Sequence, residues 1–112
     1  MIQKIFQNDV TIETFTLGNT VTYIGSEVFR GCTSLKSLTL PFVGSQRGNT
    51  NAESAFGWIF GLKNRTALRR LQNNLNSYAV PTSLTTIEIT DETIIADNAF
   101  LNCDNVTTIT IN

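Results

Sequence analysis

The sequence predicts a β-rich α/β solenoid: a short right-handed array of coils, with a parallel sheet on one face and one expanded coil containing a helix. Three observations predict this fold. Two distant segments are similar along their length, a short apolar frame recurs four times, and a stretch without that frame separates its second occurrence from its third. With 112 residues, of which 41% are hydrophobic, the chain fits a single domain over residues 1–112.

The longer repeat joins TYIGSEVFRGCTSLKSLTLP (22–41) with TIIADNAFLNCDNVTTITIN (93–112). Five positions are identical: Thr22/Thr93, Ile24/Ile95, Phe29/Phe100, Cys32/Cys103 and Thr39/Thr110. Other positions exchange one aliphatic residue for another. Because the two cysteines occupy the same place in two similar segments, they are better read as packing positions than as nucleophiles.

The second half of this unit recurs more widely, as the pattern apolar-x-x-apolar-x-apolar. It occurs at Ile12-Phe15-Leu17, Leu35-Leu38-Leu40, Leu84-Ile87-Ile89 and Val106-Ile109-Ile111. The first and second occurrences, and likewise the third and fourth, are separated by roughly 22–23 residues, a period typical of a solenoid coil. The second and third are separated by about two such periods, so one coil has been replaced or expanded.

Each frame predicts one short strand with two different faces. In LKSLTL, Leu38 and Leu40 point inward while Ser37 and Thr39 point outward, because successive side chains of a strand alternate. Phe29 and Phe100 then lie on the return segments and fill the interior of their coils. Replacing either by Ala is expected to cost about 3–5 kcal/mol.

The two cysteines are expected to be free. Equivalent positions two or three coils apart lie roughly 10–14 Å apart at the strand spacing of about 4.8 Å. That separation exceeds the limit of about 7 Å between Cα atoms joined by a disulfide. Cys32 and Cys103 are therefore interpreted as small apolar side chains in a buried stack, where free cysteine is common.

The repeat unit resembles the BspA-like, or Treponema-type, leucine-rich repeats of bacterial surface proteins. Their unit reads roughly I-G-x-x-A-F-x-x-C-x-x-L-x-x-I-x-L-P, which IGSEVFRGCTSLKSLTLP (24–41) matches nearly throughout. IADNAFLNCDNVTTITIN (95–112) matches with Ala96 for the Gly and Asn112 for the Pro. The resemblance covers about residues 11–41 and 83–112. It implies a secreted or cell-surface protein, extracellular in location, that adheres to macromolecules.

The outward side chains of the predicted sheet are the first candidate ligand-binding residues. Those of the last three strands are Ser37, Thr39, Thr86, Glu88, Thr108 and Thr110. One interpretation is a ligand-binding face. The other is that Thr is frequent in strands and tolerates water. Ice binding, which also uses flat threonine arrays, is disfavoured because Glu88 and the expanded coil interrupt the array.

The insertion, residues 41–83, holds the remaining candidates. Residues 43–51 read as a loop and residues 64–78 as a helix with one apolar stripe, which Pro81 ends. The candidate ligand contacts here are Trp58, Arg65, Arg69 and Arg70. The basic residues favour either an anionic partner or a solvated helix face. The five aromatic residues of the insertion favour either a glycan or peptide platform or a small core packed on the coils.

Composition argues against several functions. The chain has no His, which removes the common hydrolase templates and the usual zinc sites. No phosphate-binding loop or metal-ligand spacing is present, so we expect no catalytic residues, no metal and no cofactor. The net charge of -1 gives no field for binding nucleic acid. The longest apolar run, residues 55–62, is too short to span a membrane. The first ten residues contain no secretory signal.

The sequence therefore predicts a non-enzymatic binding module with an unidentified protein or glycan ligand. The alternative is a spacer in a larger surface array, with no ligand of its own. The final TITIN lies within a sheet-forming unit, and nothing polar covers the last strand. This indicates either a fragment of a longer array or end-to-end self-association through uncovered solenoid ends.

Overall fold

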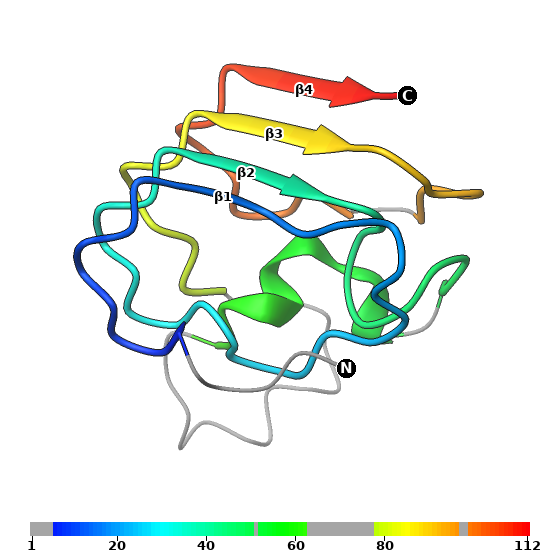
Figure 1. Cartoon of the computed structure of the whole chain (residues 1–112), viewed down its shortest axis with the longest axis horizontal. Helices are drawn as coiled ribbons and strands as arrows, with labels where there is room; N and C mark the ends of the chain where they lie inside the picture. The colour runs from blue at the N-terminus through cyan, green and yellow to red at the C-terminus, as the bar shows by residue number, and fades with distance from the viewer. Residues whose placement is uncertain (1–5, 51, 63–77, 97–98) are drawn as a thin grey trace.

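The computed structural model describes residues 6–50, 52–62, 78–96 and 99–112, and within them four short strands form one sheet (Figure 1). The strands are β1 (Thr14–Thr16), β2 (Ser37–Leu40), β3 (Thr86–Ile89) and β4 (Thr108–Ile111). They follow one another in chain order, β1-β2-β3-β4, and each pair is parallel. The chain must therefore return beneath the sheet between successive strands, so that each strand and the return segment before it form one coil.

The register of the sheet follows the apolar frame of the sequence. Phe15 lies beside Leu38, Leu38 beside Ile87, and Ile87 beside Ile109. In β2 and β3 the inward residues are buried and the outward residues are half-buried. The burial of each apolar row against its neighbours explains why one frame per coil is sufficient to fix the register.

The insertion lies between β2 and β3 in the sequence. Its described part lies beneath the sheet, on the same side as the return segments of the coils. These two strands pair directly, so the described residues between them add no further strand to the sheet. Two 3-10 helices, η2 (Ala52–Ser54) and η3 (Phe56–Ile59), lie beneath the sheet (Figure 1). The helix predicted over 64–78 lies almost entirely outside the described residues.

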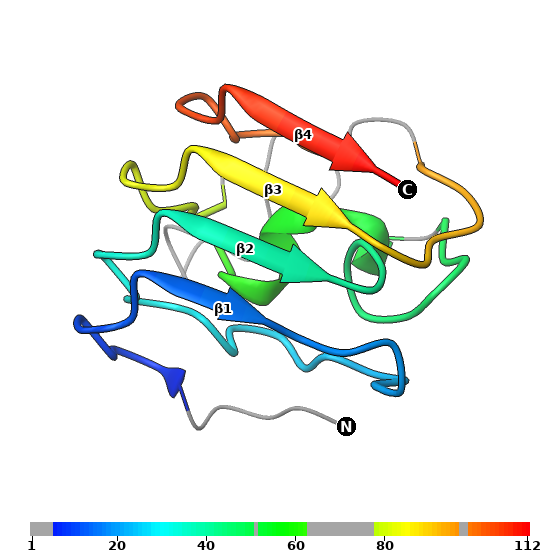
Figure 2. The same ribbon diagram turned by 45° about the horizontal axis from the view of Figure 1, so that its top comes forward.

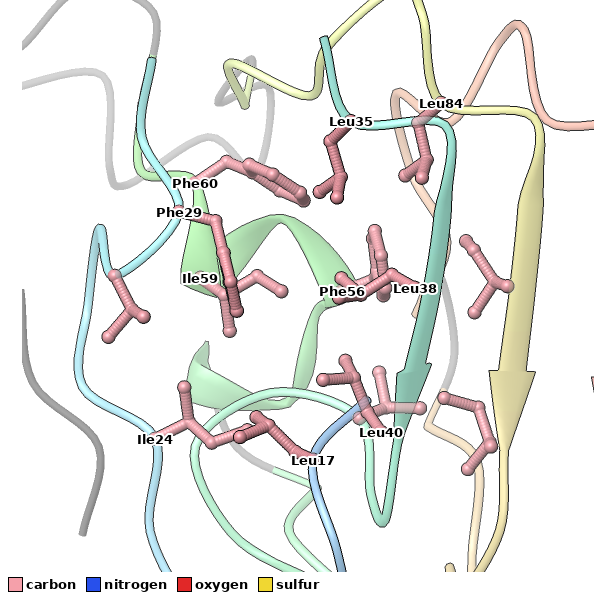
Figure 3. Packing of buried hydrophobic residues seen from close by; sticks show 14 of the residues in the cluster. Leu17, Ile24, Phe29, Leu35, Leu38, Leu40, Phe56, Ile59, Phe60 and Leu84 are labelled. Carbon is pink, nitrogen blue, oxygen red and sulfur yellow. The ribbon is translucent and has the colours of Figure 1, made fainter. Parts of the chain in front are cut away.

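Five phenylalanine rings run through the interior from the first coil to the last. The centroid of Phe6 is 5.6 Å from that of Phe29, and Phe29 is 6.3 Å from Phe60. Phe60 is 5.6 Å from Phe56, which is 5.9 Å from Phe100. The insertion therefore supplies the rings that lie between the two halves of the sequence repeat. Figure 3 shows Phe29, Phe56 and Phe60 among the aliphatic residues of this core.

A tight turn on the return side recurs in three coils. Asn8, Gly31 and Asn102 all have positive φ, at 62°, 81° and 71°. Asn and Gly are the residues that adopt this conformation at the lowest cost. In each case a backbone N–H one residue later donates to the phenylalanine carbonyl two residues before the turn residue, at 3.1–3.2 Å. The same local geometry thus repeats although only the second and third turns precede a cysteine.

Two charged residues fix the loop after β2 to the turn after β3. The Glu92 carboxylate accepts hydrogen bonds from the backbone N–H groups of Val43 (3.1 Å), Gly48 (2.6 Å) and Thr93 (2.8 Å). The Arg47 guanidinium donates to the carbonyl of Asp91 at 2.8 Å and lies 3.0 Å from its carboxylate. We call this set of contacts the loop clamp.

Removing the Glu92 carboxylate is expected to destabilise the protein. Glu92→Ala leaves three N–H groups without their charged acceptor, and a buried bond to a charged group contributes about 1.5–3 kcal/mol. Because Glu92 is only half-buried, we expect the free energy of unfolding, measured in urea, to fall by about 2 kcal/mol. The matched control is Glu88→Ala, which removes a carboxylate bonded to Asn112 alone among the described contacts, and which should change stability by less than about 0.5 kcal/mol. Equal losses would contradict the clamp.

Candidate ligand-binding face

The outward face of the sheet carries two straight rows of short polar side chains. Thr14, Ser37, Thr86 and Thr108 form the first row, in register. Thr16, Thr39, Glu88 and Thr110 form the second. Seven of the eight positions carry a hydroxyl group. We call these eight residues the outward face.

The outward face is open. In Figure 2 the four strands lie in front of the two 3-10 helices, and no described segment crosses in front of the sheet. The rows follow from the alternation of side chains along each strand combined with parallel, unshifted pairing. The residues of one row are therefore about 4.8 Å apart from strand to strand.

Chemically, the face offers hydrogen bonds with little net charge. Each hydroxyl can both donate and accept. Glu88 supplies the single carboxylate of the eight residues, and its Oε2 accepts from Nδ2 of Asn112 at 2.9 Å. At the margin, Lys36 and Glu13 form an exposed ion pair at 3.6 Å. Such a surface suits a polar, uncharged ligand better than a phosphate-bearing one.

The structure brings together six of the ten predicted ligand-binding residues. Ser37, Thr39, Thr86, Glu88, Thr108 and Thr110 all belong to the outward face. Trp58 belongs to η3, on the opposite side of the sheet, where its Nε1–H donates to the carbonyl of Ile24 at 2.7 Å. Arg65, Arg69 and Arg70 lie outside the described residues.

The aromatic residues of the insertion pack inward. Phe42, Phe56 and Phe60 are fully buried, and Trp58 packs against the same cluster. Tyr78 lies close to Gly57, and burial raises the pKa of its phenol. Of the two interpretations of these aromatic residues, a small core on the coils agrees with this packing.

Both cysteines are free, as predicted. Cys32 is fully buried and its thiol donates to the carbonyl of Phe6 at 3.1 Å. Cys103 is half-buried in the last coil. Burial raises the pKa of both thiols, and burial together with the nearby Asp104 carboxylate raises the pKa of Cys103 to about 12.

These thiols are expected to be unreactive in the folded protein. A pKa of about 12 leaves about one thiol in ten thousand as thiolate at pH 8, and the thiolate is the reactive form. We expect the folded protein to react with a chromogenic disulfide reagent at pH 8 far more slowly than the protein unfolded in guanidinium, which should release two thiols. The rate for the folded protein should rise with pH above 8, because deprotonation of Cys103 is then the limiting step. Rapid labelling at pH 8 would contradict this environment.

The structure also has a hollow beside the second coil, which no pattern in the sequence predicts. It has a volume of about 420 Å³ and is lined by Asn8, Gly31, Val80 and Pro81, among others. Arg30 also borders it, but its guanidinium donates to the carbonyls of Phe60 and Leu62 at 3.2 and 2.6 Å. These contacts join residues far apart in the chain, so no local pattern could have predicted them. The arginine ties the second coil to the insertion.

In the part of the chain that the structure describes, no three acidic or sulfur-bearing side chains gather closely enough to hold a metal ion. In the same part, no helix combines the length and the apolar character that crossing a bilayer requires.

Successive parallel strands, one per coil, with an apolar frame inside and an open sheet outside, define a leucine-rich-repeat type of solenoid. The chain belongs to the BspA type leucine-rich repeat region family, whose model matches residues 2–112 in six copies. The matched range includes the insertion. No curated protein and no solved structure matches the chain. The family is typical of bacterial surface proteins and is generally a non-enzymatic repeat module.

Proposed function

We propose that this protein is a non-catalytic binding module of a bacterial cell-surface or secreted protein, and that it adheres to a macromolecule through the outward face. The observation that carries the proposal is the pair of in-register hydroxyl rows on an open parallel sheet. A glycan or a polar protein surface is the ligand chemistry that such rows fit. The insertion, as one expanded coil, provides a second contact region.

The geometry of the face supports this function physically. Backbone pairing holds the hydroxyl-bearing strands, so few rotatable bonds are frozen when a ligand binds. The rows repeat at about 4.8 Å, which allows a flexible or extended ligand to make several similar contacts at once. Weak individual hydrogen bonds can then add up to useful affinity.

The experiment is a glycan and extracellular-matrix array probed with this protein, followed by titration of the strongest hit. We expect Thr39→Arg, at the centre of the face, to reduce affinity at least tenfold, because a long charged side chain displaces the ligand from both rows. The matched control is Thr20→Arg, which makes the same change at an exposed turn residue outside the sheet. Its affinity should stay within twofold of the unaltered protein.

The outcomes separate the binding module from a spacer. Affinity lost in Thr39→Arg alone, with both variants melting within a few degrees of the parent, supports the outward face. No binding to any array component would favour the spacer. Equal loss in both variants would place the binding surface elsewhere.

A further inference from the structure

The outward face lacks the side chains that anchor a protein ligand. Its eight residues are six threonines, one serine and one glutamate. The residues that contribute most to protein–protein affinity are typically Trp, Tyr and Arg, and the buried centre of such an interface is largely apolar. The outward face offers neither. Its hydroxyl groups suit the hydroxyls of a sugar, because both partners donate and accept. The chemistry of the face therefore favours a glycan over a protein surface.

The layout of the outward face favours a ligand that runs across the strands. Along one strand only two outward residues are available, such as Ser37 and Thr39 in β2. Across the strands each row offers four residues in register, about 4.8 Å apart. An extended peptide advances about 3.3 Å per residue, and about 6.6 Å to its next side chain on the same side. Neither step matches the row, so a peptide lying across the strands loses register with it.

A polymer of hexose rings joined through equatorial bonds matches the rows better. Such rings form a flat ribbon, and one ring is about as long as the spacing of about 4.8 Å between neighbouring strands. Each ring then lies over one strand, with its C–H face on the peptide backbone between the two rows. Its equatorial hydroxyls point sideways, toward the two outward side chains of that strand. In β2 these side chains are Ser37 and Thr39, and in β3 they are Thr86 and Glu88.

Glu88 adds a stronger acceptor to the second row. Its Oε2 accepts from Nδ2 of Asn112 at 2.9 Å, and its Oε1 has no partner among the described contacts. A carboxylate oxygen accepts a hydrogen bond from a hydroxyl more strongly than a neutral oxygen does. The same negative charge repels an acidic polymer. Glu88 therefore favours an uncharged ligand.

We propose that the outward face binds a linear, uncharged polysaccharide of equatorially linked hexoses, which runs across the strands with one sugar over each. This ligand class rests on the proposed function, because it is assigned to the same face. The four strands of the sheet hold four consecutive sugars. Affinity should therefore depend on the length of the ligand and on the geometry of its linkages.

The first test is a calorimetric titration of this protein with β-1,4-linked oligomers of glucose, mannose and N-acetylglucosamine, from two to six sugars long. We expect at least one series to bind, with affinity rising at each added sugar up to four and changing less than twofold beyond four. The matched control is the α-1,4-linked glucose series. It has the same hydroxyl groups, but its curved chain does not keep one ring over each strand, so its affinity should be at least tenfold lower.

The second test places the ligand on the rows. Thr86→Val keeps the shape and the strand preference of the side chain and removes one hydroxyl from an inner strand. We expect the tetrasaccharide to bind about two- to tenfold more weakly, the range of one neutral hydrogen bond. Thr20→Val makes the same change at an exposed turn residue outside the sheet, and the affinity should stay unchanged. Both variants should melt within a few degrees of the parent.

Two results would overturn this ligand class and leave the binding module intact. One is that no oligomer binds, whereas a matrix protein binds and Thr39→Arg abolishes that binding. The other is that α-linked oligomers bind as tightly as β-linked ones. Oligomer binding that neither Thr86→Val nor Thr39→Arg weakens would remove the outward face from both proposals. Binding of no glycan and no protein would also overturn both proposals, and would favour the spacer.

Discussion

Phe29→Ala is expected to lower the free energy of unfolding by about 3–5 kcal/mol. Phe29 is fully buried, and its ring contacts Phe6, Phe15 and Phe60. Truncation leaves a cavity between rings from three different parts of the chain, and a rigid stack of coils has little freedom to close it. Since a domain of this size is stable by about 5–15 kcal/mol, the variant should melt many degrees lower. The measurement is urea unfolding followed by circular dichroism.

Phe100→Ala is the matched comparison, because it removes the same side chain from the same position of the repeat. From the sequence we expect equal costs for the two changes. The structure places Phe100 in the half-buried last coil with one ring contact, to Phe56 at 5.9 Å, among the described residues. We now expect about half the loss found for Phe29→Ala. Equal losses for the two variants would contradict the difference in burial.

Gly44→Ala is expected to be nearly as damaging, at about 3 kcal/mol. Gly44 has a φ of 87°, which is unfavourable for a residue with a Cβ. An added Cβ would collide with the Glu53 carbonyl oxygen and lie 2.8 Å from the Ser54 Cα. Both contacts are with backbone, which moves only if the loop separates from η2. We therefore expect loss of the hydrogen bond from the Ser45 N–H to the Glu53 carbonyl, now 3.0 Å, as faster amide exchange.

Gly18→Ala is the matched control, because it makes the same chemical change at a position where an added Cβ meets no steric obstacle. No atom lies within 4 Å of the position that a Cβ would occupy. The substitution restricts the unfolded chain, so stability should be unchanged or rise by up to about 1 kcal/mol. If Gly44→Ala and Gly18→Ala behave alike, the loop around Gly44 is not held as the structure shows.

The apolar frame predicts the sheet because it depends only on the alternation of side chains within one strand and on the regular spacing of successive frames. Alternation along a strand sets which side chains face inward, and the regular spacing of the frames sets which of them stack. Those two facts are sufficient for the register of Phe15, Leu38, Ile87 and Ile109. The same alternation places the six threonine, serine and glutamate candidates on one face.

The insertion could not be predicted in the same way. Its contacts join residues distant in sequence, such as the Ser45 carbonyl with the Ile24 N–H at 2.9 Å, or Glu92 with Val43. No periodicity encodes such pairs. Trp58 is a ligand candidate by sequence because aromatic residues gather in the insertion, yet its indole N–H is already bonded to the backbone of Ile24. Aromatic content alone does not distinguish a binding platform from a core.

The insertion also links coils that a simple array would keep apart. The Phe29 N–H donates to the Ile59 carbonyl at 2.8 Å, and the Phe56 N–H donates to the Ala99 carbonyl at 2.6 Å. One short helix is thus bonded to the second coil and to the last. Repeat arrays often fray from their ends because each unit touches only its neighbours. Here the cross-ties make fraying costly, so unfolding should be a single cooperative transition with coincident midpoints for every probe.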